Sequence, residues 1–351
     1  MYRGHTVGVV VPAYNEAPFV GTVIETMPAF VDYVYAVDDR STDDTWDEIC
    51  ARSTAGGPAD GVAIPVADGS VTRTTDTDGG VVTDDASPVV VPIRHERNRG
   101  VGAAICTGYR RSLEDGVDVT AVMAGDGQMD PDQLERLLDP VVDGRADYAK
   151  GNRLRDRRAA DSMSRFRLFG NGLLSMLTKM ASGYWPLLDP QNGYTAISRD
   201  ALEAIDLESL YESYGFSNDL LVALNTHSFR VADVSMPAVY GNEESHIAYR
   251  SFVPSLSWLL LRGFIRRLGV RYAWRDFHPL IGLYALGAGG IAIAVGRVLR
   301  STGRGRELGL SADSGGRLRG LVGWLWASAL AVVLAMIFDR LANEELVVTV
   351  E

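Results

Sequence analysis

Short apolar runs of strand length alternate with amphipathic stretches of helical period through the first 142 residues. This alternation predicts an α/β protein with a mostly parallel sheet flanked by helices. The expected strand and helix pairs are residues 7–11 and 17–27, 33–37 and 42–52, 89–93 and 99–115, and 117–123 and 131–142. In such sheets ligands bind at the carboxyl ends of the strands, so the loops that follow each strand are the candidate site.

Two other regions depart from this pattern. Residues 54–88 are rich in Gly, Thr and Asp and have weak periodicity, which indicates a surface insertion between a helix and the third strand. Residues 250–276 interleave Trp258 and Leu261 with arginines, namely Arg262, Arg266, Arg267, Arg271 and Arg275. A basic amphipathic segment of this kind suits an anionic membrane surface.

The C-terminal part predicts a membrane hairpin. Residues 279–296 and 320–338 carry no charge and are each long enough to span a bilayer, with an arginine-rich loop at 297–319 between them. The alternative is a buried helical hairpin within a soluble domain. Two spans would return the C-terminus to the side of an N-terminal domain at 1–245, but the arginines of the connecting loop leave the orientation open.

Charge is unevenly spread over the chain, whose net charge is -11. The last 101 residues hold 12 arginines against 7 acids, whereas the first 250 hold 22 bases against 38 acids. This acidic body argues against nucleic acid as a partner. Only two basic residues are lysine, which fits either adaptation to high salt or a genome that prefers arginine codons. Cys50 and Cys106 are too few and scattered for a disulfide framework or a zinc site.

The loop after the first expected strand, Pro12 to Glu16, lacks the glycines of a dinucleotide fingerprint. Gly100 and Gly102 form only part of such a motif, which disfavours a dehydrogenase. Asp38 and Asp39 end the second strand, and only one of them could cap the next helix. A carboxylate there is well placed to accept from ribose hydroxyls or a base N–H.

Asp126 and Gln128 follow the fourth expected strand and are separated by one glycine. Their carboxylate and amide oxygens can point to one side of a turn, and such ligands suit Mg²⁺ or Mn²⁺ when phosphates complete the shell. Asp130 and Pro131 are more simply the cap and first turn of the next helix.

In order along residues 6–245, these motifs resemble the family 2 glycosyltransferases of the Rossmann-like GT-A fold, and among them the membrane-attached dolichyl or polyprenyl phosphate hexosyltransferases. The matching stretches are VVVPAYNE (9–16), VDDRSTDDT (37–45), NRGVGAA (98–104), DGQMDP (126–131), GNR (151–153) and DPQNGY (189–194).

The resemblance implies roles for individual residues. The nucleotide sugar would be held by Pro12, Tyr14, Glu16, Asp38, Asp39, Gly102 and Asp126. Asp126 and Gln128 match the metal and diphosphate site, Arg153, Arg167 and Gln191 the acceptor phosphate site, and Asp126, Asp189 and Arg153 the catalytic set. The chain departs from the family at Ala124, where a first aspartate is usual, at Val101, where lysine is common, and at Thr195, where arginine is common.

These matches imply inverting transfer of a hexose from a UDP- or GDP-sugar to a polyprenyl phosphate, with Mg²⁺ or Mn²⁺ as cofactor. Two alternatives remain: transfer to a hydroxyl of a lipid-linked glycan, with Asp189 or Asp219 as base, and a membrane-anchored nucleotide-sugar-binding protein without activity. The polar start at Met1–Thr6 lacks a signal-peptide pattern, and nucleotide sugars are cytosolic, so we expect a two-span membrane protein whose catalytic domain faces the cytosol.

Overall fold

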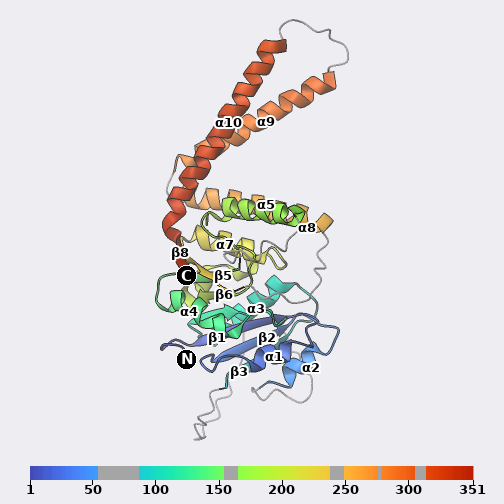
Figure 1. Ribbon diagram of the computed structural model, residues 1–351, viewed down its shortest axis with the longest axis vertical. Helices are drawn as coiled ribbons and strands as arrows, with labels where there is room; N and C mark the ends of the chain where they lie inside the picture. The colour runs from blue at the N-terminus through green and yellow to red at the C-terminus, as the bar shows by residue number, and fades with distance from the viewer. Residues whose placement is uncertain (54–86, 154–164, 238–248, 276–277, 305–313, 351) are drawn as a thin grey trace.

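The computed structural model describes residues 1–53, 87–153, 165–237, 249–275, 278–304 and 314–350 (Figure 1). In that part of the chain, one eight-stranded sheet has the order β3-β2-β1-β4-β6-β5-β7-β8. The strands are β1 Val7–Ala13, β2 Tyr33–Asp38, β3 Val89–Arg94, β4 Val119–Val122, β5 Tyr148–Asn152, β6 Thr195–Ser198, β7 Val231–Ser235 and β8 Val347–Val350. Neighbouring strands are parallel except at β6, which runs antiparallel to β4 and β5. The predicted α/β class with a mostly parallel sheet is confirmed.

Helices cover both faces of this sheet because its strands are buried on both sides. Val9 and Val11 of β1 face a core shared with α1, α2 and α4, whereas Val10 faces a core shared with α3, α6 and α7. These helices are α1 Val20–Glu25, α2 Thr45–Cys50, α3 Val101–Glu114, α4 Leu134–Val142, α6 Arg199–Ala204 and α7 Phe216–Thr226. Short 3₁₀ turns lie at Pro131–Gln133 (η1) and Leu207–Ser209 (η3).

The first four expected strand and helix pairs appear in the structure with shifted ends. The insertion expected at 54–88 lies outside the described residues except for its last two positions. The sequence did not indicate β8, which adds to β7 in parallel after the last long helix and the 3₁₀ turn η5, Glu344–Leu346. The polypeptide therefore returns to the sheet after its most apolar segment.

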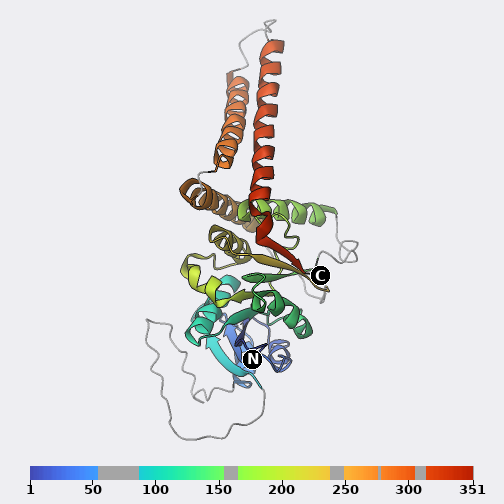
Figure 2. The ribbon, with the colours of Figure 1, turned by 90° about the vertical axis from the view of Figure 1, so that its left-hand side faces the viewer.

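Three helices lie between this sheet and a projecting hairpin. In both views, α5 (Arg165–Ser182) and α8 (Tyr249–Arg267) run across the base of the hairpin, with α7 below them (Figures 1 and 2). Ala181, Val222 and Leu260 join α5, α7 and α8 in a small apolar core. The π-helical segment η4, Leu268–Arg275, then connects α8 to the hairpin.

The hairpin consists of α9, Leu280–Arg304, and α10, Ser314–Asn343. Windows at Leu280–Arg297 and Gly320–Leu346 are long and apolar enough to cross a membrane, and only 28% and 11% of their residues are buried. A soluble core helix would be mostly buried, so these fractions oppose the alternative of a buried hairpin. Both helices extend into the arginine-rich segment expected as a loop.

Two of the arginines expected to face a membrane surface are instead buried. The guanidinium of Arg267 donates two parallel hydrogen bonds to Asp339 of α10, at 2.8 and 2.7 Å, and neither residue has any exposed surface. Its remaining bonds go to the carbonyl oxygens of Met180 and Ala181 at the end of α5. Arg271 donates to the carbonyl and side-chain oxygens of Asn225. For these two arginines the membrane-facing prediction is wrong, because each has internal acceptors.

Candidate active site

The loop after β1 is held in place by the loop after β2. The backbone N–H groups of Asn15 and Glu16 donate to the hydroxyls of Ser41 and Thr45, at 2.9 and 2.8 Å. The Asn15 side chain in turn accepts from the N–H of Thr42 at 2.8 Å. Tyr14, in the loop after β1, is 46% exposed. Pro12 to Glu16 thus form a rigid rim at the carboxyl edge of the sheet, as expected.

Asp38 and Asp39 are buried and already have internal partners. Asp38 accepts from the N–H of Ser41 and pairs with Arg94 at 2.9 Å. Asp39 accepts from His95 at 2.7 Å and from the N–H groups of Arg99 and Gly100 at 2.8 and 2.7 Å. Burial opposes ionisation of Asp39, but these hydrogen bonds hold its pKa below the usual range. Both aspartates therefore hold the loops after β2 and β3 together, and their predicted contact with a nucleotide stays a prediction.

Gly102 has a packing role in the structure. A Cβ at this position would lie 2.4 Å from the carbonyl oxygen of Tyr211 and 2.8 Å from Cβ of Phe216. The first turn of α3 can therefore approach the segment before α7 only with glycine there. Its predicted contact with a nucleotide stays a prediction.

Asp126 and Gln128 lie on a tight turn directly after β4. The N–H of Gly125 donates to the carbonyl of Pro12 at 3.1 Å, so this turn lies against the end of β1. The carboxylate of Asp126 accepts from the N–H of Gln128 at 3.0 Å, and Gly127 between them has φ +70°, a conformation that favours glycine. Ala124, in place of the usual first aspartate, is half-buried at the start of the turn.

Asp126, Gln128 and Arg153 line one pocket of about 120 Å³. The other residues around it are Met129, Asp130, Gln133, Asn192, Gly193, Tyr194, Met236 and Pro237. Asp126 and Arg153, 27 positions apart in the sequence, are brought together here because β4 and β5 both lie against β6. The pocket combines acidic and amide oxygens with one guanidinium, an arrangement suited to a phosphate group with a divalent cation.

Arg153 is tied to Asp189 at the wall of this pocket. Its Nε donates to Oδ2 of Asp189 at 3.0 Å; the arginine side chain is 42% exposed, whereas that of Asp189 is 5% exposed. The buried carboxylate thus orients the guanidinium and leaves part of it accessible to a ligand. To act as a base, the buried Asp189 would have to give up this ion pair.

Lys150 is a residue at this site that the sequence reasoning missed. It lies on β5, has no exposed surface, and donates to the carbonyl oxygen of Asn192. Burial lowers the pKa of Lys150 to about 8, although Asp189 acts in the opposite direction. A lysine directly after Tyr148 and Ala149, in a chain with two lysines, was the available signal. Its contact braces the loop that carries Asp189 and Gln191.

The other predicted acceptor residues are more scattered. Gln191 lies on the same loop, but its amide donates to Asn218 of α7 at 2.8 Å and it does not line the pocket. Arg167 lies in α5, and its side chain is outside the described part of the structure. Asp219, the other candidate base, lines a separate pocket against α8.

The oxygen ligands near Asp126 are few. In the described residues, no group of three or more His, Cys, Asp or Glu side chains could hold a metal ion. One carboxylate and one amide are nevertheless a suitable partial ligand set for Mg²⁺ when a diphosphate supplies further oxygens. The side chains present therefore fit a divalent cation that arrives with its substrate.

The structure thus joins a mostly parallel α/β sheet, with a pocket of carboxylate, amide and guanidinium groups at its carboxyl edge, to two helices apolar enough to span a membrane. The family model for glycosyl transferase family 2 matches residues 64–206. Polyprenol monophosphomannose synthase of Mycolicibacterium smegmatis is 30% identical over 238 residues, which cover 64% of this chain and 74% of that protein. The chain belongs to glycosyltransferase family 2.

Other similar proteins include UDP-N-acetylglucosamine–dolichyl-phosphate N-acetylglucosaminyltransferase of Methanococcus voltae, 28% identical over 151 residues. That match covers 43% of this chain and 60% of the relative, so the chain spans three-fifths of it. Among solved structures, glucosyl-3-phosphoglycerate synthase from Mycobacterium tuberculosis, in complex with Mn²⁺, uridine diphosphate and glucosyl-3-phosphoglycerate, has 19% identity and a TM-score of 0.49. The alignment covers 76% of this chain and 81% of that one.

Proposed function

We propose that this protein transfers a hexose from a UDP- or GDP-sugar to a polyprenyl or dolichyl phosphate at the membrane, with inversion at the sugar carbon. The observation that carries the proposal is the pocket in which Asp126, Gln128 and Arg153 converge. The relatives named above support the same class of acceptor, because one is named for making polyprenol monophosphomannose and the other for transfer to dolichyl phosphate.

Asp126 and Gln128 would hold a divalent cation together with the diphosphate of the donor. When bound, Mg²⁺ or Mn²⁺ would supply Lewis-acid stabilisation of the charge that develops on the leaving nucleoside diphosphate. The rim at Pro12 to Glu16 would hold the nucleotide beside this turn, since the two are joined through Gly125. Because Asp126 and Gln128 would be two protein ligands at most among the described residues, metal affinity without nucleotide should be poor.

Arg153 would orient the acceptor phosphate. An oxygen of this phosphate attacks C1 of the sugar from the face opposite the diphosphate; the new C1–O bond forms as the old one breaks, and the nucleoside diphosphate leaves with the electron pair. A phosphate monoester has a second pKa of about 6, so it is already ionised at neutral pH and needs no base to remove a proton. Transfer to a hydroxyl would need one, and both candidates are engaged: Asp189 with Arg153, Asp219 with the N–H of Tyr211.

The membrane part supports this assignment by its position. The apolar hairpin and α8 lie above the catalytic domain in Figures 1 and 2, so a lipid acceptor would enter from that side. Since nucleotide sugars are cytosolic, we propose that the catalytic domain faces the cytosol and that the chain spans the membrane twice.

Membranes that contain the full chain provide the test. They are incubated with Mg²⁺ or Mn²⁺, a polyprenyl phosphate and labelled nucleotide sugars, and the lipids are then extracted. We expect a labelled lipid product that mild acid cleaves. Asp126→Asn should lower the rate by on the order of a hundredfold or more, because it removes the one charged protein ligand of the cation, and excess EDTA should have the same effect.

The matched control is Asp132→Asn, which removes an exposed carboxylate six residues further on, outside the pocket lining. It should keep full activity. Label found only in larger glycans would favour the hydroxyl acceptor, and nucleotide binding without turnover of any sugar would favour the inactive binding protein. Full activity of Asp126→Asn or in EDTA would contradict the cation site.

A further inference from the structure

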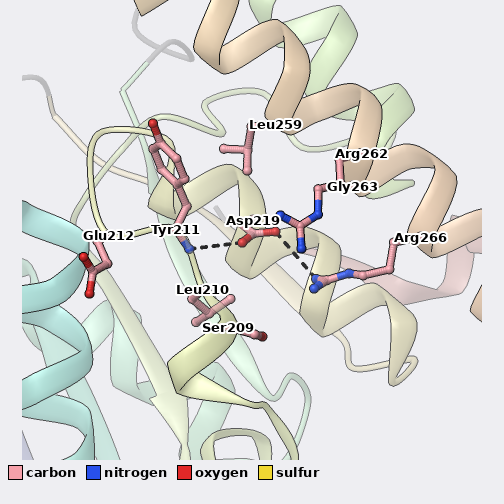
Figure 3. A pocket seen from close by; sticks show the side chains of 9 residues that line it. All are labelled: Ser209, Leu210, Tyr211, Glu212, Asp219, Leu259, Arg262, Gly263 and Arg266. Carbon is pink, nitrogen blue, oxygen red and sulfur yellow. Dashed lines mark hydrogen bonds and ion pairs between the residues drawn. The ribbon is translucent and has the colours of Figure 1, made fainter.

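A second pocket, of about 280 Å³, lies between α8 and the segment that precedes α7. Figure 3 shows Arg262 and Arg266 reaching from α8 toward Asp219, with the backbone at Tyr211 on the far side. The remaining lining residues are Ser209, Leu210, Glu212, Leu259 and Gly263. None of these nine residues lines the pocket around Asp126.

The charges of this pocket do not cancel. Asp219 accepts from the N–H of Tyr211 at 3.1 Å and lies 3.6 Å from Arg266, a loose pairing. Within the described residues, Arg262 forms no ion pair and is exposed. The carboxylate of Glu212 is used elsewhere, because it pairs with Arg99. Two guanidinium groups thus face one carboxylate, which leaves an excess of about one positive charge.

The pocket adjoins an apolar face of α8. Trp258, Leu261 and Ile265 are 67%, 49% and 61% exposed, and their spacing of three and four residues places them on one side of the helix. Arg262 and Arg266 lie on the neighbouring side, one turn apart. An exposed apolar face next to two arginines, at the base of the membrane hairpin, is the arrangement that places cationic side chains at headgroup level.

We propose that this pocket binds the phosphodiester headgroup of an anionic membrane phospholipid, at a site separate from the transfer site. One net positive charge matches the single negative charge of a phosphodiester, and the arginines provide forked donors for its oxygens. The volume of about 280 Å³, against about 30 Å³ for one water molecule in the liquid, leaves room for the phosphate and its glycerol carbons. The acyl chains would lie along Trp258, Leu261 and Ile265.

Such a lipid would influence the transfer site through α7. Asn218, the neighbour of Asp219, accepts a hydrogen bond from Gln191 at 2.8 Å and another from Thr178 of α5 at 2.9 Å. The helix that forms the floor of the lipid pocket therefore also supports the loop beside Arg153. Lipid binding itself is independent of sugar transfer, so the proposal can be tested without an active enzyme.

The test uses the full chain in a neutral detergent, titrated with short-chain phosphatidylglycerol and followed by calorimetry or native mass spectrometry. We expect one saturable site per chain. Arg262→Gln combined with Arg266→Gln should weaken binding by tenfold or more. The control is Arg340→Gln, because Arg340 is exposed near the C-terminal end of α10 and does not line the pocket; this change should alter binding by less than twofold. Asp219→Asn should tighten binding several-fold, because the competing carboxylate is lost while the acceptor for Tyr211 remains.

Three parallel titrations distinguish the ligands. Phosphatidylcholine and inorganic phosphate should bind at least tenfold more weakly than phosphatidylglycerol. Equal binding of inorganic phosphate would overturn the lipid assignment. Tighter binding of a short polyprenyl monophosphate that is lost in the double variant would make the pocket part of the acceptor site, and would also overturn it. Unchanged phosphatidylglycerol binding by a folded double variant, judged by an unaltered unfolding midpoint, would refute the pocket itself.

Discussion

Two polar regions of this molecule use their charges in opposite ways. At the base of the hairpin, Arg267 and Asp339 are fully buried, and the carboxylate also accepts from Tyr272, Trp185 and Asn343. In the pocket around Asp126, the side chains of Asp126, Gln128 and Arg153 are half-buried, and among the described residues Arg153 has a single acidic partner. The first region has satisfied its hydrogen-bonding capacity internally, whereas the second keeps capacity for a ligand.

The difference shows how to separate structural from functional charges in this chain. A buried ion pair is costly to break because removal of one partner leaves the other uncompensated. Substitution of a half-exposed arginine beside a buried carboxylate should lower the free energy of unfolding less. Its main consequence should be the loss of a contact with a ligand. Substitutions in the two regions should therefore affect different measurements.

The largest expected effect is on stability, from Asp339→Ala. This change leaves Arg267 buried without its counter-charge and should lower the free energy of unfolding by about 3–5 kcal/mol. The apparent unfolding midpoint of the detergent-solubilised chain, followed by tryptophan fluorescence, measures it. Replacing both partners, Arg267→Met with Asp339→Leu, should recover only part of the loss, because Tyr272, Trp185 and Asn343 still lose an acceptor.

The control for this prediction is Glu203→Ala, which breaks the exposed pair between Arg199 and Glu203, at 2.7 Å. Exposed helical pairs contribute only about 0.3–0.5 kcal/mol, so the midpoint should barely move. Equal decreases in the unfolding midpoint of Asp339→Ala and Glu203→Ala would contradict the distinction between the buried ion pair at Asp339 and an exposed surface pair.

The sequence predicted those features that depend on local pattern. Alternating apolar runs gave the strands β1 to β4, and their carboxyl ends gave the loops that hold Asp39 and Asp126. The uncharged run ending at Phe338 marked the second apolar helix. Asp339, directly after it, looked like the end of a span rather than the partner of Arg267, because the two are 72 residues apart.

The remaining features depend on long-range contacts that no local pattern reveals. β8 is a short strand, and its apolar residues follow a long apolar helix, so the sequence pattern did not separate the two. The partners of Asp39 come from residues about 60 positions away. Lys150 gave a composition signal, but its partner, a backbone carbonyl at Asn192, has no sequence signature. The roles predicted for individual site residues remain proposals.

An intermediate effect is expected from Arg153→Lys, on the acceptor alone. Lysine keeps the positive charge beside Asp189 but lacks the planar fork that suits a phosphate. The KM for polyprenyl phosphate should rise by about tenfold, which corresponds to about 1.4 kcal/mol, while the KM for the nucleotide sugar stays within twofold. Steady-state kinetics with each substrate varied in turn gives both values.

Arg145→Lys is the matched control for this change. Arg145 is also paired with one aspartate, Asp143 at 3.3 Å, but it lies on the surface before β5. It should leave both KM values unaltered. A rise in the nucleotide-sugar KM in Arg153→Lys, with no change for the acceptor, would move Arg153 from the acceptor to the donor side of the site.

The smallest expected effect compares two buried cations, Arg267 and Lys150. Burial lowers the pKa of Lys150 to about 8 from an ordinary value of 10.5, with Asp189, Arg153 and Asp233 as its charged neighbours. Between about pH 8 and 10.5 the unfolded chain therefore binds more protons at this group, so its contribution to the free energy of unfolding rises with pH. Below pH 8 the full cost of burying the charge remains, and above pH 10.5 it has gone.

Comparison of the wild type with Lys150→Met isolates this contribution, because other groups that titrate in the same range are common to both. As the pH is raised from 7.5 to 10, the unfolding midpoint of the wild type should increase relative to that of the variant. Parallel curves would mean that Lys150 keeps its proton through its contact with Asn192. Lys150 would then resemble Arg267, as a buried cation whose charge is compensated by its contacts. The side of the Asp126 pocket formed by Asn192 would then be stabilised internally, like the hydrogen-bonded residues around Asp339.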